Sequence, residues 1–337
     1  MNAKPVKLLK SAFWALLAVV LLWFSFRGVD WAEFWKVIRS SHWGYVLLAM
    51  AAGVLAFVFR ALRWRLLLLP SEPSTKRLDC YDGFTIGKLC DFVVPHVGEF
   101  VRCGYVLSPR LTYDKALGTV VLERAWDILM LMLLIVILLV FRGEQFGEFF
   151  LEKMLEPAAA RLNISLWWLL VVLLALAAGA VWAVFALRRR RSSRPDAGRA
   201  QRPSLLDRVA GFFRGLGQGF SSFLGMKGKG WFLLLTALLW LMFLLMSWLI
   251  IKALPSDLGL TLVDALFIML VGSVAGIVPV PGGFGAFHYL VALALQTIYS
   301  VPFETGIIFA TLSHESQAVT MILCGLLSYA RQALKHR

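Results

Sequence analysis

Long apolar runs dominate the pattern of this chain. An α-helix of about 20 apolar residues crosses a bilayer core about 30 Å thick. Six runs are long and apolar enough to do so, at about 11–26, 44–59, 116–141, 165–187, 231–254 and 303–330. We therefore predict an all-α polytopic membrane protein with about six full spans.

Two further apolar stretches, at about 83–108 and 261–299, are interrupted by proline and glycine. The first contains GKLCDFVVPHVGEFVR at 87–102, and the second contains GSVAGIVPVPGGFGAFH at 272–288. A broken helix is tolerated at membrane depth only where its freed backbone is buried in protein or lines a cavity. The interruptions predict two re-entrant helical hairpins.

The two motifs resemble one another. They align with Pro95 on Pro279, and each has a glycine seven or eight residues before that proline. Proline suits the first turn of a half-helix, and glycine permits the positive φ of a tight tip. The residues expected to shape the tips are Pro95, Gly98, Pro279, Pro281, Gly282, Gly283 and Gly285.

Composition agrees with an integral membrane protein. The 337 residues are 60% hydrophobic and 16% charged, with a mean hydropathy of +0.76, which leaves too few polar residues for a soluble domain's surface. The four cysteines have no C-x-x-C spacing and lie in or beside apolar segments, so we interpret them as small hydrophobic residues. The net charge of +14 is typical of a cytoplasmic Lys and Arg excess, and we expect no nucleic-acid partner.

The distribution of charge predicts an orientation. With both termini cytoplasmic and each hairpin returning to its own side, the cytoplasmic segments hold 24 of the 34 Lys and Arg residues and six acids. The opposite loops hold seven of each. This positive-inside bias favours a multi-pass protein of the cell (inner) membrane. The same orientation opens the two hairpins from opposite faces, as an inverted repeat requires.

We expect one transmembrane domain over residues 1–337. Repeat one covers about 44–141 and repeat two about 231–330, joined by a basic cytoplasmic linker at 188–230. The second half of this linker spaces apolar residues at helical intervals, which fits a helix on the anionic inner leaflet. An ordinary polar linker is the alternative.

Charged residues inside the apolar stretches are the candidates for chemistry. Each charge at the bilayer centre costs about 2.5–3.5 kcal/mol, so such groups should face a cavity or one another. Seven acids and three bases qualify: Asp91, Glu99, Glu123, Asp127, Asp264, Glu304, Glu315, Lys88, Arg102 and Arg124.

In the first motif, His96, Glu99 and Arg102 are spaced by three and would share a face of a helix that follows Pro95. The helix N-terminus and the two basic side chains would then bind a phosphate or carboxylate. The alternative is an internal pair between Glu99 and Arg102 that only locks the hairpin. The second motif offers backbone rather than side-chain chemistry, and its glycines could equally serve helix packing.

Two further groups are polar within apolar spans. Arg124 is placed to pair with Asp127, which leaves Glu123 to find another partner, such as Arg102. His314 and Glu315 lie among Ser and Thr residues of the last span, where they form either a structural polar seam or part of a headgroup or proton path. His288 is interpreted as a packed, hydrogen-bonded residue.

Signatures of soluble enzymes are missing from the sequence. It contains no G-x-S-x-G, H-E-x-x-H, P-loop, G-x-G-x-x-G or D-x-D motif, and its loops are short. We therefore expect no enzyme, no cofactor and no metal.

Three motifs in this order resemble the lysylphosphatidylglycerol synthase transmembrane region, or flippase-like domain, family: PHVGEFVR at 95–102, ERAWD at 123–127 and PGGFG at 281–285. The resemblance implies an inner-membrane protein that translocates lipids. We expect this chain to hold only the membrane half of the family's two-domain members, without a synthetase domain before Arg337. His96 and His288 depart from the arginine and glutamate usual in relatives.

These observations favour a translocase for an anionic or zwitterionic lipid, either a phospholipid or a polyprenyl-phosphate-linked molecule. The alternatives are a membrane enzyme or enzyme subunit acting on a lipid, and a non-transporting scaffold. The sequence leaves the oligomeric state open, with a homo-oligomer among the options. The expected path residues are His96, Glu99, Arg102, Glu123, Arg124, Asp127, His314 and Glu315.

Overall fold

The computed structural model describes residues 30–92, 94–150, 226–276, 278 and 280–335, together with Trp23 and Phe26. These residues form helices and no strand. The predicted span at 165–187 lies outside the described residues, as do almost all of the span at 11–26 and most of the linker at 188–230.

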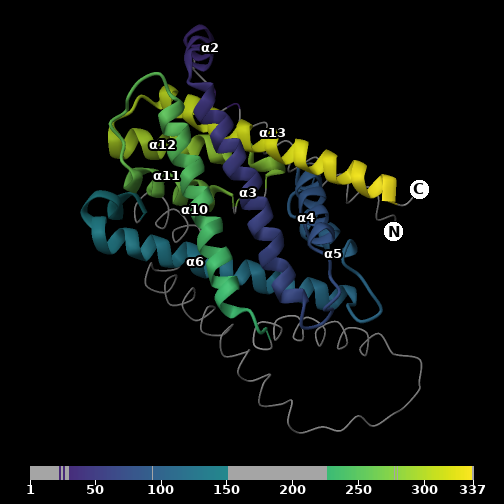
Figure 1. Cartoon of the computed structure of the whole chain (residues 1–337). Helices are drawn as coiled ribbons and strands as arrows, with labels where there is room; N and C mark the ends of the chain where they lie inside the picture. The colour runs from purple at the N-terminus through teal and green to yellow at the C-terminus, as the bar shows by residue number, and fades with distance from the viewer. Residues whose placement is uncertain are drawn as a thin grey trace, which may run out of the picture. The chain divides into compact units, whose positions relative to one another are not determined.

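Four of the six expected spans are present as long apolar helices (Figure 1). They are α3 (Trp43–Leu68), α6 (Tyr113–Glu148), α10 (Lys229–Ala253) and α13 (Phe303–Lys335). Helical hydrogen bonding does not stop where an apolar run stops, so α3, α6 and α13 extend past the predicted spans into polar residues. The chain is a multi-pass α-helical membrane protein.

Both predicted interruptions are breaks between helices. In the first, α4 (Arg77–Asp91) ends before Pro95 and α5 (Gly98–Gly104) begins after it. In the second, α11 (Leu262–Ala275) and α12 (Ala286–Tyr299) flank the short 3-10 turn η2 (Pro281–Gly283). We call these two segments the first and second hairpins.

The chain forms two compact units, each assembled from separate parts of the sequence. The first, which contains both hairpin tips, comprises residues 1–62, 81–102 and 233–337. The second comprises residues 63–80 and 103–232 and contains α6. We call them the hairpin unit and the α6 unit and describe each by itself.

Within the hairpin unit, α3 and α10 are antiparallel neighbours (Figure 1). At one end the backbone N–H of His42 donates to the carbonyl of Ala253 at 2.7 Å. Farther along, a Cβ on Gly53 would lie 3.4 Å from Met246 Cε, an ordinary van der Waals distance, so the two helices are in contact there.

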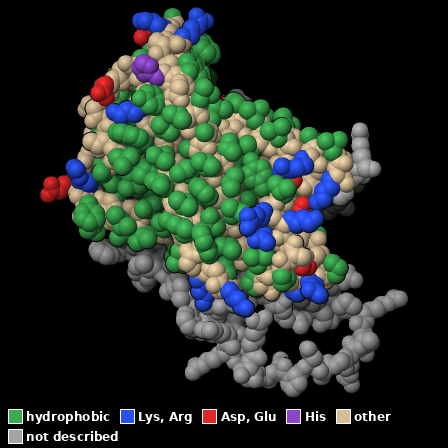
Figure 2. Space-filling view, in the orientation of Figure 1, with side chains coloured by type: hydrophobic (Ala, Val, Ile, Leu, Met, Phe, Trp, Pro, Cys, Tyr) green, Lys and Arg blue, Asp and Glu red, His purple; other side chains and the backbone are tan. Residues whose placement is uncertain are grey.

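Hydrophobic side chains cover the outer face over α3 and α10 (Figure 2). Leu47 on α3 is 62% exposed and Leu233 on α10 is 51% exposed. A face this apolar is stable against lipid tails rather than water.

Acidic side chains hold several helix ends of the hairpin unit. Thr261 and Asp264 form a reciprocal capping box at the start of α11, and the Tyr299 hydroxyl donates to Asp264 Oδ1 at 2.8 Å. The backbone N–H of Asp30, which caps α2 (Trp31–Ser40), donates to Glu304 at 2.6 Å. Asp264 and Glu304, both expected to be membrane-embedded charges, therefore stabilise helix ends.

Glycines bring α13 close to both hairpins. A Cβ on Gly306 would lie 2.8 Å from Ala292 Cα on α12. A Cβ on Gly325 would lie 2.9 Å from Leu89 Cβ on α4. Because α13 contacts α12 of the second hairpin and α4 of the first hairpin, its side chains can reach both hairpins.

In the α6 unit, the end of α3 packs against α6. The indole N–H of Trp64 donates to the Thr119 hydroxyl at 2.9 Å. A small apolar core in the same unit consists of Leu67, Leu122, Met226 and Phe232. These contacts hold the basic end of α3 beside the acidic segment of α6.

Candidate functional site

The first hairpin closes through two glycines and one carboxylate. A Cβ on Gly98 would lie 2.0 Å from the Gly87 carbonyl oxygen, so the two arms can approach only because both residues are glycine. Asp91 Oδ1 accepts the Gly98 N–H at 2.7 Å, and Asp91 Oδ2 pairs with Lys88 at 2.9 Å. The backbone donor that was expected to bind an anion is therefore occupied by Asp91.

His96, Glu99 and Arg102 are only partly arranged as predicted. Glu99 and Arg102 form an ion pair of 2.8 Å on α5, which is the alternative that the sequence left open. His96 precedes the helix, has a left-handed backbone with φ of 61°, and is exposed. The helix starts at Gly98 because Asp91 caps it there, so His96 lies on the tip and not on the face of Glu99 and Arg102.

Three cations surround one aromatic ring at the base of the first hairpin. The guanidinium carbons of Arg60 and Arg102 and the ammonium of Lys88 lie 5.8, 6.0 and 5.9 Å from the centre of the buried Phe84 ring. The negative face of the ring attracts each cation. This arrangement keeps positive charge beside the hairpin without exposing it to lipid.

The second hairpin closes through its backbone. Gly282, Gly283 and Gly285 have positive φ values of 62°, 80° and 83°, which side chains with a Cβ rarely adopt. A Cβ on Gly272 would lie 2.6 Å from the Phe287 ring, so this glycine admits the returning arm. The position of Pro279 lies outside the described residues, and Pro281 begins η2.

The two hairpin tips meet inside the hairpin unit. The rings of Phe92 and Phe284 have centres 6.3 Å apart, and a Cβ on Gly282 would lie 3.2 Å from Phe92 Cδ1. The tips border a pocket of about 320 Å³, which α10, α11 and α13 complete. Its polar lining residues are Lys88, Asp91, His96, Ser247, Ser273, Ser313, His314 and Gln317.

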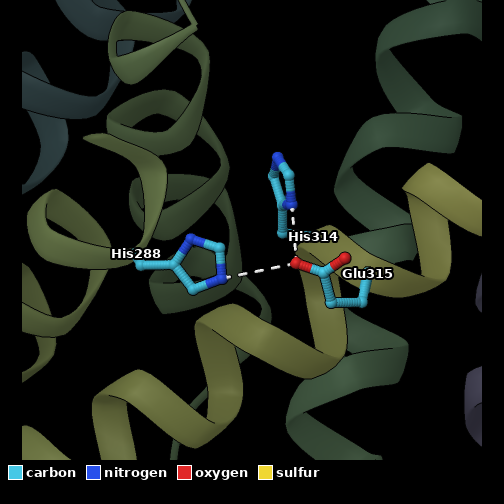
Figure 3. Close-up of side chains that lie close together, drawn as sticks. All are labelled: His288, His314 and Glu315. Carbon is cyan, nitrogen blue, oxygen red and sulfur yellow. Dashed lines mark hydrogen bonds and ion pairs between the residues drawn. The ribbon is translucent and has the colours of Figure 1, made fainter. Parts of the chain in front are cut away.

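Beside this pocket, α12 and α13 bring two histidines to one carboxylate (Figure 3). Glu315 Oε1 lies 3.2 Å from His314 Nδ1 and 3.7 Å from His288 Nε2. The other ring nitrogen of His314 contacts the Gly282 carbonyl at 2.8 Å. The predicted pair of His314 and Glu315 thus connects α13 to the tip of the second hairpin, and His288 joins it.

The remaining predicted path residues form a cluster in the α6 unit. Arg63 donates to Glu123 at 3.1 Å and to Asp127 at 2.6 Å, and Arg124 lies 3.6 Å from Asp127. The predicted pair of Arg124 and Asp127 is observed. Glu123 is fully buried and pairs with Arg63 on α3, a partner that the sequence did not suggest.

Arg63 and Asp82 are two of the buried charges that are not among the residues predicted from the sequence. Arg63 is fully buried although it follows the apolar run of α3, and its spacing of three from Arg60 on an extended helix was the available signal. Asp82 is buried on α4 and accepts hydrogen bonds from Arg331 and from Gln332, the latter at 2.6 Å. Arg63 and Asp82 could be recognised as buried only once α3 and α4 were seen to extend beyond the predicted apolar stretches.

Outside the spans, Glu72 organises the turn after α3 in the α6 unit. It accepts hydrogen bonds from Ser108 at 2.6 Å and from Ser74 at 2.7 Å. These bonds favour the charged form, so the hydrogen bond from Ser108, followed by that from Ser74, lowers the pKa of Glu72 below its ordinary value.

These features define a class: a polytopic helical membrane protein with two interrupted helices whose tips border a polar pocket. The family model described as "Lysylphosphatidylglycerol synthase TM region" matches residues 11–325, and the chain belongs to this family. The resemblance identified from the three motifs is confirmed. A search of curated proteins and a search of solved structures gave no match.

Proposed function

We propose that this protein translocates a lipid with an anionic or zwitterionic headgroup between the two leaflets, and that it does so without catalysing a covalent reaction. The observation that carries the proposal is the polar pocket between the two hairpin tips. Family membership supports a role with membrane lipids. A pocket formed by broken helices is where membrane transporters bind their substrates.

The polar side chains of the pocket, which lie in a mainly apolar lining, fit a headgroup. Its lining contains the Lys88 ammonium and the Asp91 carboxylate, and His96 and His314 add imidazole nitrogens. The buried cations Arg60 and Arg102 beside Phe84 add positive potential on the same side. A lipid phosphate would therefore bind near Lys88, and an amine of a zwitterionic headgroup would bind near Asp91.

The proposed movement uses the hairpins as two gates. In this proposal they form an inverted repeat, open from opposite faces and expose the pocket alternately while the acyl tails stay in lipid. Both termini would be cytoplasmic and the membrane would be the cell inner membrane, as the charge distribution favours. The linker at 188–230 would contact the anionic leaflet.

Transport is tested by reconstituting the full chain in liposomes that contain a fluorescent anionic phospholipid. The rate at which the label exchanges between leaflets is followed by quenching of the outer leaflet. We expect the wild type to exceed protein-free liposomes by at least tenfold, and Lys88→Met to lose most of this increase. Lys252→Met is the matched control, because Lys252 lies on α10 against Trp248 and does not line the pocket.

The outcomes separate the proposal from the alternatives. A wild-type rate equal to that of protein-free liposomes, for both anionic and zwitterionic labels, would overturn translocation. A new lipid species in the mass spectrum of the recovered lipids would instead indicate an enzyme. Equal losses of exchange rate in Lys88→Met and Lys252→Met would show that the pocket takes no part in translocation.

A further inference from the structure

The geometry around Glu315 points to a second site, and we propose that His288, His314 and Glu315 bind one divalent transition-metal ion of the Zn²⁺ class. Their ligand atoms lie within 4.8 Å of one another. The sequence contains no metal-binding motif, since His288 lies on α12 and the other two residues lie on α13 (Figure 3). The proposal does not depend on lipid translocation.

The protonation of His314 is the first step of the argument. Its Nε2 lies 2.8 Å from the Gly282 carbonyl oxygen, which can only accept, so Nε2 carries a proton. In the neutral ring Nδ1 then presents a lone pair toward Glu315 Oε1, 3.2 Å away. Two acceptors at this distance repel one another unless a cation or a proton lies between them.

A metal ion explains why all three side chains face one another, whereas a proton explains only the contact between His314 and Glu315. A proton on Nδ1 would join His314 to Glu315 but leave His288 Nε2 at 3.7 Å from the same oxygen, which is too long for a hydrogen bond. His288 is 1% exposed, and its Nδ1 has no hydrogen-bond partner among the described residues. An ion between the three groups would give His288 Nε2, the nitrogen that faces Glu315, a polar partner, whereas Nδ1 would keep none among the described residues.

Two of the three distances between ligand atoms fit a tetrahedral ion, and all three lie within 4.8 Å. With metal–ligand bonds of about 2.0–2.2 Å, neighbouring ligand atoms lie about 3.3–3.6 Å apart. The two contacts of Glu315 are 3.2 and 3.7 Å. Two imidazoles and one carboxylate favour Zn²⁺ and similar ions over Mg²⁺ or Ca²⁺, which prefer oxygen ligands.

The surroundings also resemble those of a metal site. The Nε2–H of His314 donates to a backbone carbonyl, which is the outer contact that orients a ligating histidine. Aromatic rings enclose the histidines: Phe284 lies 4.8 Å from His314 and Phe26 lies 5.7 Å from His288, centre to centre. Glu315 is 42% exposed, which gives an ion a way in, and three protein ligands leave the fourth position open.

The test is metal titration of the full chain, purified without a polyhistidine tag and stripped with a chelator. Co²⁺ serves as the visible probe of tetrahedral geometry, and Zn²⁺ displaces it. We expect one ion per chain. His288→Gln and Glu315→Gln should each weaken binding at least tenfold, as loss of a ligand requires. His42→Gln is the matched control, because His42 is exposed and outside the cluster, and it should bind like the wild type.

One further variant, together with Glu315→Gln, keeps the result decisive. His288→Cys offers a thiolate ligand and should restore Zn²⁺ binding that His288→Gln loses. Glu315→Gln changes a partly exposed side chain at constant size, so its folding is the least at risk. Absence of a bound ion in the wild type, or wild-type affinity in Glu315→Gln, would overturn the proposal and leave a protonated His314 paired with Glu315.

Discussion

Both hairpins use a glycine to bring their two arms together, but different groups close their tips. In each, a glycine of the first arm admits the returning arm: Gly87 meets Gly98, and Gly272 meets Phe287. The first hairpin then closes on a side chain, since Asp91 accepts the Gly98 N–H and holds Lys88. The second closes on three glycines in left-handed conformations and has no charge of its own at the tip.

This difference shows where the charge of each tip comes from. The first hairpin carries its own charges in Lys88, Asp91 and the pair of Glu99 and Arg102. The second borrows an imidazole from α13, because the Gly282 carbonyl contacts His314. A glycine-rich tip can therefore take part in a polar site through its backbone, provided a neighbouring helix supplies the side chain.

The largest expected effect is at the arm contact of the first hairpin. Gly98→Ala places a methyl group 2.0 Å from the Gly87 carbonyl oxygen, and a backbone atom cannot move aside cheaply. We expect a loss of about 3 kcal/mol or more in the free energy of unfolding, at the upper end for overpacking. Thermal unfolding of the protein in detergent measures it.

Gly104→Ala is the control for Gly98→Ala. Gly104 lies on the same helix, and a Cβ there would meet nothing within 4 Å. We expect this variant to match or slightly exceed the wild type in stability, because alanine favours helix. If Gly98→Ala unfolds at the same temperature as Gly104→Ala, the hairpin arms do not touch in the way described.

A smaller effect is expected at the tip of the second hairpin. Gly282→Ala forces a side chain into φ of 62°, which costs about 1–2 kcal/mol. The matched control is Gly276→Ala, where φ is −67° and the nearest neighbour of an added Cβ is at 3.4 Å. Denaturant titration of the two variants measures the difference, and a smaller loss for Gly282→Ala than for Gly276→Ala would contradict backbone closure.

The smallest effect separates charge from hydrogen bonding in the first hairpin. Asp91→Asn keeps an oxygen for the Gly98 N–H and loses the charge beside Lys88, a partly exposed pair, so we expect a loss below about 1 kcal/mol. Asp91→Ala also removes the acceptor and should cost about 1–2 kcal/mol. Equal losses in the two variants would mean that the charge, and not the hydrogen bond, closes this hairpin.

Much of the fold could be predicted from the sequence because it depends on local properties. Apolar runs gave α3, α6, α10 and α13, and proline and glycine gave both interruptions. The helix ends were less predictable. Polar residues such as Arg63 continue α3 beyond its apolar run once partners on another helix compensate their charge.

The sequence predicted which residues belong to the candidate site better than it predicted which of them contact one another. Arg124 with Asp127 and Glu99 with Arg102 are three residues apart on one helix, so spacing alone predicted the first contact and offered the second as an alternative. The partner of Glu123 is 60 residues away, and no spacing rule reaches that far. The role of the described path residues in transport stays a prediction.

By itself, the sequence determined a polytopic helical membrane protein of this family with two broken helices, because hydrophobicity and backbone preference act within a few residues. Only the tertiary structure decided that Asp91 occupies the N–H expected to bind an anion, that Arg63 neutralises Glu123, and that His288 joins His314 and Glu315. Such contacts depend on which helix faces pack together, and that packing is the sum of many weak contacts along the whole chain.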